Sequence, residues 1–486
     1  MFKFKFNCNL RQKIKAVKRR SHKLYNKLFI YLPVDILIFL RIKPLQDKRK
    51  SIIIFRHDGI GDYVLFRNFM EILKKSPKFA GYKITLLGNA AWKDLSEFLD
   101  KGFIDEFIWL DKKKFTGDFF YRYKKFKEIT SVKYEILIHP FSREFFNADN
   151  DLACLMTAGK KIGSIGISRF IKPYKKKILE KIYTELIPDV ENVWFEFYKN
   201  KNFFERILSE KINTGKPFIN LPTINLPSPS SELYENLAPY AAFFIGASVK
   251  HRKWPAKNFA ETALYLHKKY GYNIVLCGGK SELSDAAEFK NYLKTKKIDI
   301  DNSIKSTHSG NNTPLTDTVG KISLVDLLYV AKNASLVISN ETMAPHIAMA
   351  LANANETADD DINSTNSNAA IVPIVPIVPT VPIIPAAPTA AIVPIVPTAV
   401  SKPAVIVISA GEASYGHFSP YPEEMGGNYT AVFHPYIEKK LKEYINIMAA
   451  FGRGYNDRFD ISEIPVKALI DKLDKIHEIN GGNGVK

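Results

Sequence analysis

The stretch "SIIIFRHDGIGDYVLF", residues 51–66, decides the fold class. Its apolar run, 52–55, is typical of a strand buried on both faces, and a helical pattern begins at Tyr63. The polar turn between the two contains Gly59, Gly61 and Asp62. A buried strand, a glycine-containing turn and a helix in this order are typical of the first unit of a βαβ domain with a parallel sheet.

The same alternation of apolar runs and helical patterns occurs in two series along the chain. The first series predicts strands at 51–55, 83–88, 107–110 and 134–140. The second series predicts strands at 240–248, 272–279, 335–340 and 404–409. Two successive Rossmann-like βαβ domains are therefore expected, and ligands of such sheets bind beyond the carboxyl ends of the strands. A cleft between the two domains is the expected place for chemistry.

The 486 residues divide by composition into segments of different character. A basic amphipathic extension comes first, a Pro-, Ser- and Asn-rich linker separates the two domains, and a low-complexity insert interrupts the second domain. The predicted bounds are 1–50 for the extension, 51–215 for the first domain, 216–236 for the linker, 237–486 for the second domain and 354–402 for the insert.

The extension carries 15 Lys and Arg residues but only two Asp residues, so it holds +13 of the net charge of +19. Its apolar stretch 28–40 has 13 residues, fewer than the ~20 that span a bilayer. An interfacial anchor on an anionic membrane fits this composition, with apolar side chains in the headgroup boundary and cations against the lipid. The alternative is a helical extension that packs on the first domain.

Prolines fall in one register of period three through most of the segment 371–403, and this is the period of polyproline II. A docking ligand for an aromatic groove, a rigid spacer and an insertion without a catalytic role are the open interpretations. The insert also separates the predicted helix after Asn340 from the strand at 404–409, so it either loops out over the surface or disturbs that helix.

The turn at 59–62 is an incomplete dinucleotide fingerprint. Val64 stands where the third glycine is expected, and the charge of Asp62 would repel a diphosphate. An acid on a strand-to-helix turn suits a general base instead. The alternative role of Asp62 is to cap the helix that begins near Tyr63. A nicotinamide oxidoreductase, which needs the complete fingerprint, is disfavoured.

The second domain carries a more suitable phosphate site. The sequence "SNETMAPHIAMALAN" follows a predicted strand, with Asn340 placed to cap a helix whose first amides, together with Thr342, can bind a phosphate. His346 lies on the same helix and either contacts ligand or is structural. The loop "GASVKHRKWPAKNFAE" gathers groups that suit a diphosphate, namely Ser248, Lys250, Arg252 and Lys253.

Three motifs in this order resemble glycosyltransferase family 9, whose best-known members are the ADP-heptose:lipopolysaccharide heptosyltransferases. They are "RHDGIGDYVLFRNFMEILK", "GASVKHRKWPAKNFAE" and "VGKISLVDLLYVAKNASLVISNETMAPHIAMALA". The resemblance extends from about Ser51 to Ile476, interrupted by the insert. It implies a GT-B-type fold, in which two Rossmann-like domains face a cleft, and an inverting transferase that needs no metal.

The resemblance also implies roles for single residues. Asp62, the last residue of the "R-x-D-x-x-G-D" turn, corresponds to the catalytic base, and Gly59 and Gly61 are the turn glycines. The donor-binding positions correspond to Ser248, Arg252, Lys253, Ile322, Glu341, Thr342, Met343 and His346. The family pattern "D-T-G-x-x-H" is altered here, and the side chain of Met343 narrows the pocket where backbone should lie against phosphate.

Three residues near the end of a first-domain strand are candidates either for contacts with the acceptor or for local loop contacts. They are His139, Ser142 and Arg143.

We therefore expect a glycosyltransferase without a metal or other cofactor. It would move a sugar such as heptose from a nucleotide-diphosphate donor such as ADP-heptose to a lipopolysaccharide core or related cell-surface glycan. The expected partners are the nucleotide sugar, a lipid-linked acceptor and an anionic membrane surface contacted by residues 1–50, but no nucleic acid. The alternative is a non-catalytic interaction protein on the same fold that displays the polyproline segment.

The expected location is peripheral, on the cytoplasmic face of the plasma membrane of a bacterial-type cell. Three cysteines without paired spacing favour such a reducing compartment and offer no metal site.

Overall fold

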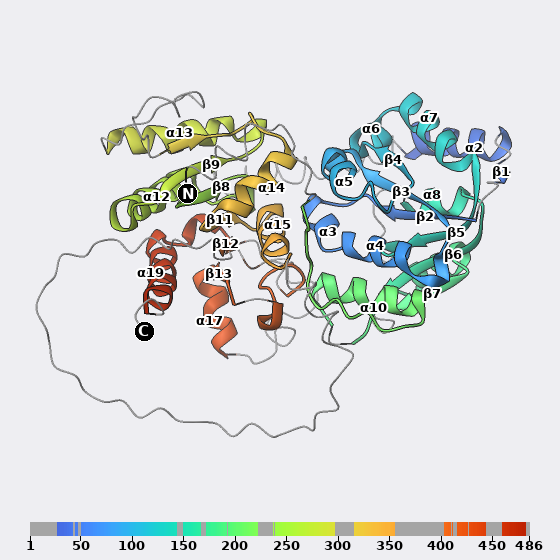
Figure 1. The fold of residues 1–486 in the computed structure, drawn as a ribbon. Helices are drawn as coiled ribbons and strands as arrows, with labels where there is room; N and C mark the ends of the chain where they lie inside the picture. The colour runs from blue at the N-terminus through green and yellow to red at the C-terminus, as the bar shows by residue number, and fades with distance from the viewer. Residues whose placement is uncertain are drawn as a thin grey trace, which may run out of the picture. The chain divides into compact units, whose positions relative to one another are not determined.

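The computed structural model contains two compact units, Met1–Pro217 and Phe218–Lys486, which are drawn in Figure 1. The residues that it describes are 27–41, 44–46, 50–142, 149–166, 172–191, 193–221, 237, 239–296, 315–354, 403–409, 411, 416–425, 427–443 and 459–482. Most of the predicted linker and nearly all of the Pro-rich insert lie outside the described residues.

The first unit is built on a parallel sheet with the strand order β4-β3-β2-β5-β6-β7. The strands are β2 (Ser51–Arg56), β3 (Lys83–Asn89), β4 (Glu106–Leu110), β5 (Val132–His139), β6 (Ala158–Gly166) and β7 (Glu185–Pro188), and a short β1 (Leu45–Gln46) pairs with β5. The helices are α2 (Leu32–Arg41), α3 (Ile60–Val64), α4 (Arg67–Lys75), α5 (Lys93–Leu99), α6 (Lys112–Gly117), α7 (Phe119–Thr130), α8 (Asp149–Leu155), α9 (Pro173–Ile182) and α10 (Glu196–Leu208). A π-helical turn, η1 (Lys27–Tyr31), leads into α2.

The second unit repeats this topology, with the strand order β10-β9-β8-β11-β12-β13 in a parallel sheet. The strands are β8 (Tyr240–Phe244), β9 (Asn273–Cys277), β10 (Leu315–Asp317), β11 (Leu336–Asn340), β12 (Ala404–Ser409) and β13 (Tyr429–Phe433). The helices are α12 (Ala256–Tyr270), α13 (Leu283–Thr295), α14 (Leu324–Asn333), α15 (Met343–Ala352), α17 (Pro435–Glu443) and α19 (Val466–Gly482), and a 3-10 turn, η6 (Lys250–Arg252), follows β8.

Both strand orders are those of a doubly wound sheet, in which the order reverses between the first and fourth strands of the unit. This switch point lies between β2 and β5 in the first unit and between β8 and β11 in the second. Ligands of open parallel sheets bind beyond the carboxyl ends of the strands at such a point. The turn after β2 and the turn after β11 therefore stand where a site is expected.

Periodicity explains the helices that support these turns. Phe66, Phe69, Met70 and Leu73 recur at the spacing of one helical face in and beside α4, and all four are fully buried. The ring of Phe69 lies 5.1 Å from that of Phe197 on α10, measured between centroids. This aromatic contact packs α10 against α4.

The eight strands predicted from continuous apolar runs are all present, with ends shifted by up to four residues. The runs did not predict β6, β7, β10 and β13. These strands are short or carry lysine, glycine or polar residues, so they lack the continuous hydrophobicity that marked the others.

Helix α2 of the basic extension packs on the first unit, where it contacts α7 and α8. Val34 and Ile38 are buried in the same apolar cluster as Phe126 of α7 and Leu152 of α8. Among the described residues, no helix is long and apolar enough to cross a membrane.

Candidate functional site

The turn after β2 places Asp62 at the switch point of the first unit. Strand β2 is buried along its whole length, Gly59 is the N-cap of α3, and Asp62 is the third residue of that helix. The prediction that the helix begins at Tyr63 was wrong, and Asp62 does not occupy its N-cap. The Asp62 Oδ2 atom instead accepts a hydrogen bond from the N–H of Gly59 at 3.0 Å.

Gly59 allows this geometry because it lacks a side chain. A Cβ atom at position 59 would lie 2.8 Å from Oδ2 of Asp62, closer than such atoms approach. The carboxylate would have to swing away from the backbone of residue 59 if any other residue stood there. Gly61 lies in the first turn of α3, and both Gly61 and Asp62 are half-buried.

Arg56, the last residue of β2, holds this turn from inside the unit. Its side chain is fully buried, and its Nη2 atom donates to the main-chain oxygen of Asp62 at 2.7 Å. The Nε atom lies 3.0 Å from Oδ1 of Asp58. The guanidinium carbon also lies 3.5 Å from the centroid of the Phe141 ring, which follows β5. One cation therefore connects the ends of the two central strands to the backbone of Asp62.

Asp58 is a second acid of the turn, and no role was predicted for it. It is buried, and burial raises its pKa well above the usual value although Arg56 opposes the shift. Its main-chain oxygen accepts hydrogen bonds from Nδ2 of Asn89 and Nε1 of Trp92, at 2.9 and 3.2 Å. The turn is thus tied to β3 and to the 3-10 turn after it.

Helix α10 closes the network from the other side. Asn200 Oδ1 lies 3.5 Å from Nη1 of Arg56, and Asn200 Nδ2 donates to the main-chain oxygen of Leu65 at 3.4 Å. Burial raises the pKa of Asp62, the charge of Glu196 raises it further, and Arg56 and the Gly59 N–H lower it. A carboxyl group whose pKa is raised above its ordinary value accepts a proton more readily, as a general base must.

The acceptor candidates make local contacts in this unit. His139 is buried, and its Nδ1 atom lies 2.5 Å from the hydroxyl of Tyr183, which donates to Oδ1 of Asn150 at 2.7 Å. Ser142 is also buried, and its hydroxyl donates to the main-chain oxygen of Ser164 at 2.6 Å. Arg143 lies outside the described residues. These contacts favour the local alternative for His139 and Ser142.

Asn340 ends β11 and connects two loops of the second unit. Its Nδ2 atom donates to the main-chain oxygens of Ile245 and Gly246, at 3.0 and 3.2 Å, and its Oδ1 atom accepts from the N–H of Trp254 at 2.9 Å. The expectation that Asn340 caps the following helix was wrong, because its whole amide is used to hold the loop after β8. Thr342 is the N-cap residue of α15.

The N-terminus of α15 keeps its backbone donors uncapped by any side chain in the described part of the chain. Thr342 and Met343 are half-buried at this end. Glu341 is buried, its Oε2 atom accepts a hydrogen bond from the Ser409 hydroxyl, and its Oε1 atom finds no partner among the described residues. The first amides of a ten-residue helix, aided by its dipole, form a suitable site for an anion.

His346 faces the interior of the second unit. It is buried, its Nδ1 atom lies 2.9 Å from the Tyr421 hydroxyl, and burial lowers its pKa to about 4. The ring is therefore neutral at physiological pH, and its contact is with the segment 416–421. Of the two readings of His346, the structural one agrees with this environment.

The loop after β8 presents the remaining donor-site candidates. Ser248 is exposed at its start, and Arg252 is half-buried at the end of η6. Lys253 is tied to acidic side chains, with its Nζ atom 2.7 Å from Oδ2 of Asp285 and 3.3 Å from Oε1 of Glu282. Ile322 is half-buried just before α14. The charge of Lys253 is thus partly neutralised by these two carboxylates.

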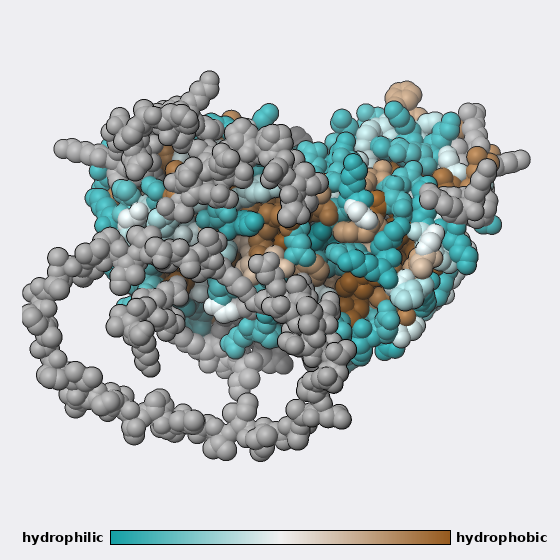
Figure 2. Space-filling view, in the orientation of Figure 1, coloured by the Kyte–Doolittle hydropathy of each residue, from teal (hydrophilic) through white to brown (hydrophobic). Residues whose placement is uncertain are grey.

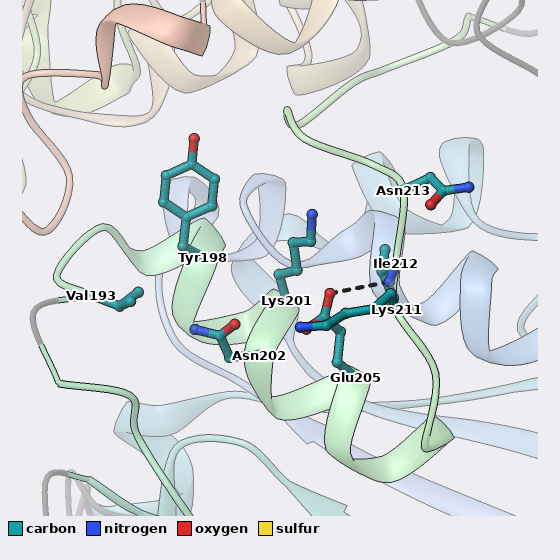
Figure 3. Close-up of a pocket in the computed structure, with 8 residues that line it drawn as sticks. All are labelled: Val193, Tyr198, Lys201, Asn202, Glu205, Lys211, Ile212 and Asn213. Atoms are coloured by element: carbon teal, nitrogen blue, oxygen red, sulfur yellow. Dashed lines mark hydrogen bonds and ion pairs between the residues drawn. The ribbon is translucent and has the colours of Figure 1, made fainter. Parts of the chain in front are cut away.

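A surface pocket of about 510 Å³ lies against α10, apart from the residues predicted from the sequence. Figure 3 shows Tyr198 and Lys201 projecting from α10 and Lys211 beside Glu205, where the Nζ–Oε2 distance is 3.1 Å. The lining residues are Val193, Tyr198, Lys201, Asn202, Glu205, Lys211, Ile212 and Asn213. Among the residues that the structure describes, no group of three or more His, Cys, Asp or Glu side chains could hold a metal ion.

Comparison with known proteins agrees with the resemblance read from the motifs. Residues 223–355 match the family model of glycosyltransferase family 9 (heptosyltransferase). This match confirms the predicted resemblance and the expected enzyme class, a glycosyltransferase. No curated protein matches the chain by sequence.

Solved structures of similar fold cover most of the chain. A glycosyltransferase family 9 structure from Veillonella parvula DSM 2008 is 16% identical, with a TM-score of 0.53 over 89% of this chain and 98% of that one. The E. coli heptosyltransferase WaaC with ADP is 13% identical, with a TM-score of 0.51 over 87% and 99%. The E. coli ADP-heptose lps heptosyltransferase II is 11% identical, with a TM-score of 0.52 over 89% and 99%. These matches confirm the expected GT-B-type fold with two Rossmann-like domains.

Proposed function

We propose that the protein is an inverting, metal-independent glycosyltransferase that uses Asp62 as its general base. The observation that carries the proposal is the half-buried Asp62 carboxyl group at the switch point of the first unit, with a raised pKa and a backbone held by buried Arg56. A base needs accessibility, a fixed position and an affinity for protons, and this residue combines the three.

The reaction would proceed in one displacement. Asp62 takes the proton from an acceptor hydroxyl while that oxygen forms a bond to the anomeric carbon of the donor sugar. The bond between this carbon and the diphosphate oxygen breaks, and the nucleoside diphosphate leaves with the electron pair. Attack from the opposite face inverts the configuration of the carbon.

The second unit would bind the donor. The uncapped N-terminus of α15 and the half-buried Arg252 suit the negative charge of a diphosphate, and Ser248 adds a hydroxyl on the same loop. Thr342 and Met343 would border the phosphates, and Ile322 the nucleoside. A donor such as ADP-heptose is proposed because one solved relative, E. coli WaaC, is described with ADP in one structure and with ADP-2-deoxy-2-fluoro heptose in another.

The acceptor would be a lipid-linked glycan, such as a lipopolysaccharide core, at the cytoplasmic face of the plasma membrane. The basic residues of the extension support this location, since cations near an anionic leaflet are each worth about 1 kcal/mol. Sugar transfer at this surface is the proposed role in building the bacterial cell envelope.

The test is transfer by the protein and its Asp62→Asn variant, with a panel of nucleotide sugars and a lipopolysaccharide-type acceptor. We expect the variant to lose at least about 100-fold in rate, because a general base is typically worth this factor or more. Binding of ADP should stay within about twofold, since the donor groups lie in the second unit.

Asp111→Asn is the matched control. Asp111 also follows a first-unit strand, but its Oδ1 atom caps α6 by accepting from the N–H groups of Lys113 and Lys114, at 2.9 and 3.0 Å. Asparagine caps a helix equally well, so the control should keep its full rate. Equal rates for Asp62→Asn and the unmodified protein would refute the base assignment. A protein that transfers no sugar at all would favour the non-catalytic alternative with its polyproline segment.

A further inference from the structure

Helix α2 and the turn before it have two apolar faces. Ile30, Val34 and Ile38 recur at a spacing of four residues and are buried against the first unit. The opposite face of α2 is largely exposed, with exposed fractions between 49 and 72% for Leu32, Ile36 and Leu40. We name these three side chains the outer face of α2. A helix that packs on its domain needs only one apolar face, so the outer face calls for a partner.

The orientation of α2 is fixed by a polar contact as well as by packing. Asp35 Oδ1 lies 2.8 Å from Nη2 of Arg122 on α7, whose side chain is fully buried. The guanidinium carbon of Arg122 lies 4.2 Å from the centroid of the Tyr31 ring. Rotation of α2 to bury the outer face would break this pair and leave a buried cation, which is costly. The outer face is thus presented away from the first unit.

We propose that the outer face of α2 docks on an anionic phospholipid bilayer and lies in the plane of its interface. Figure 2 shows hydrophobic residues at the surface where Figure 1 places α2. The inference deepens the proposed function, because it names the surface by which a transferase with a lipid-linked acceptor would reach its substrate. Packing on the domain and anchoring on a membrane were two alternatives for the extension. In this proposal both hold, because one face of α2 packs on the first unit and the other contacts the bilayer.

The charges of the extension select the bilayer among possible partners. Residues 1–50 carry 15 Lys and Arg residues, and one of their two acids, Asp35, is neutralised by Arg122. Two copies of this chain meeting at α2 would bring like charges of +13 together, which disfavours a dimer. Nucleic acid would bind the cations, but its phosphates and sugars offer no apolar surface for an exposed row of Leu and Ile. An anionic lipid surface uses both.

The length of the helix sets the depth of the contact. Residues 29–40 rise about 17 Å along a helix, well short of the ~30 Å hydrocarbon core. A helix of this length lies along the interface, with its apolar side chains at the boundary between headgroups and acyl chains.

The test is sedimentation of the full-length protein with vesicles, without any sugar donor. Phosphatidylcholine vesicles are compared with vesicles that contain about 30 mol % phosphatidylglycerol, a composition that gives the surface its negative potential. We expect the triple variant Leu32→Ser, Ile36→Ser, Leu40→Ser to bind the anionic vesicles at least about tenfold more weakly than the unmodified protein. About 0.5 M NaCl should weaken binding of the unmodified protein too, since it screens the cations.

The matched control is the pair Leu283→Ser and Tyr436→Ser. Both side chains are exposed on the second unit, by 56 and 43%, so the control removes apolar surface elsewhere and should bind like the unmodified protein. Equal vesicle binding by the triple variant and the control would overturn the proposal, as would equal binding to neutral and anionic vesicles. A dimer in solution that the triple variant abolishes, without any vesicle binding, would assign the face to a second copy. Because no transfer is measured, loss of the base assignment leaves this test unaffected.

Discussion

The two units have the same strand order but equip their switch points differently. In the first unit, the point between β2 and β5 is occupied by charge, with buried Arg56 beside Asp58 and a backbone contact to Asp62. In the second, the point between β8 and β11 is held by the neutral amide of Asn340 and followed by a helix with an uncapped N-terminus. The same topology therefore carries a turn held by a buried cation in one unit and a turn followed by uncapped helix amides in the other.

Removal of the central cation should produce the largest difference between the units. Arg56→Met leaves Asp58 buried without its counter-charge, and breaking a buried pair in this way costs about 3–5 kcal/mol. We expect this loss in the free energy of unfolding of the first unit alone. Hydrogen exchange followed by mass spectrometry measures it, with peptides from 51–110 compared with peptides from 240–277.

The double variant Arg56→Met, Asp58→Asn provides the control. It removes the stranded charge, so part of the lost stability should return. It does not restore the donor to the main-chain oxygen of Asp62, and sugar transfer should stay low. A loss below about 1 kcal/mol for Arg56→Met would contradict the role of this residue as the support of the turn.

The units should also respond to acid in opposite directions. Burial raises the pKa of Asp58, Asp62 and Asp100 in the folded protein. These groups therefore stabilise the first unit at low pH, and this stabilisation is lost as the pH rises through their folded-state pKa values. Burial lowers the pKa of His346 to about 4, so below the ordinary value of about 6.5 the unfolded chain binds a proton that the folded second unit excludes. The second unit should lose about 2 kcal/mol between pH 7 and about pH 5.

His346→Gln tests this assignment, since a neutral amide can still bond to the Tyr421 hydroxyl. The variant should have a smaller loss of second-unit stability at about pH 5 than the unmodified protein. The control is His267→Gln, at a half-buried histidine of the same unit whose Nδ1 atom contacts the Tyr272 main-chain oxygen. If His346→Gln and His267→Gln have the same pH dependence as the unmodified protein, proton exclusion at His346 does not set the acid limit.

The sequence allowed eight of the strands and the place of Asp62 in the turn after β2 to be predicted, because both depend on local patterns. Continuous apolar runs mark buried parallel strands, and a glycine-containing turn with an acid marks the carboxyl end of β2. The contacts that support the turn are not local. Asn200 is separated by 144 residues from Arg56, and Tyr421 by 75 from His346, so no spacing rule connects them.

The capping role given to Asn340 was wrong, because it relied on residue preference, which is a weak guide where a tertiary contact competes for the side chain. The alternative role of Asp62 is closer to the structure, since Asp62 is not the N-cap of α3 but its carboxylate accepts a hydrogen bond from the N–H of the N-cap residue Gly59. Asn340 satisfies three main-chain groups of the loop after β8 instead, and Gly59 takes the N-cap because its missing side chain leaves room for the Asp62 carboxylate.

The smallest effect is expected from removal of the Pro-rich insert. The elements that flank it are held independently, since β12 pairs with β11 over five residue pairs and the N–H of Ile219 donates to the Ala350 oxygen of α15 at 2.9 Å. We expect replacement of 355–402 by a linker of about six residues, a usual length between a helix and a strand, to change second-unit stability by at most about 2 kcal/mol. The binding constant for ADP, measured by calorimetry, should change by less than about twofold, because the N-terminus of α15 is the end remote from the insert.

The matched control removes 350–402, which includes the last turn of α15 and the Ala350 contact, and should destabilise the unit more. If both deletions lower the stability of the second unit equally and weaken ADP binding, the insert supports the donor site. The second switch point would then depend on the insert, and its contrast with the charged first switch point would no longer hold.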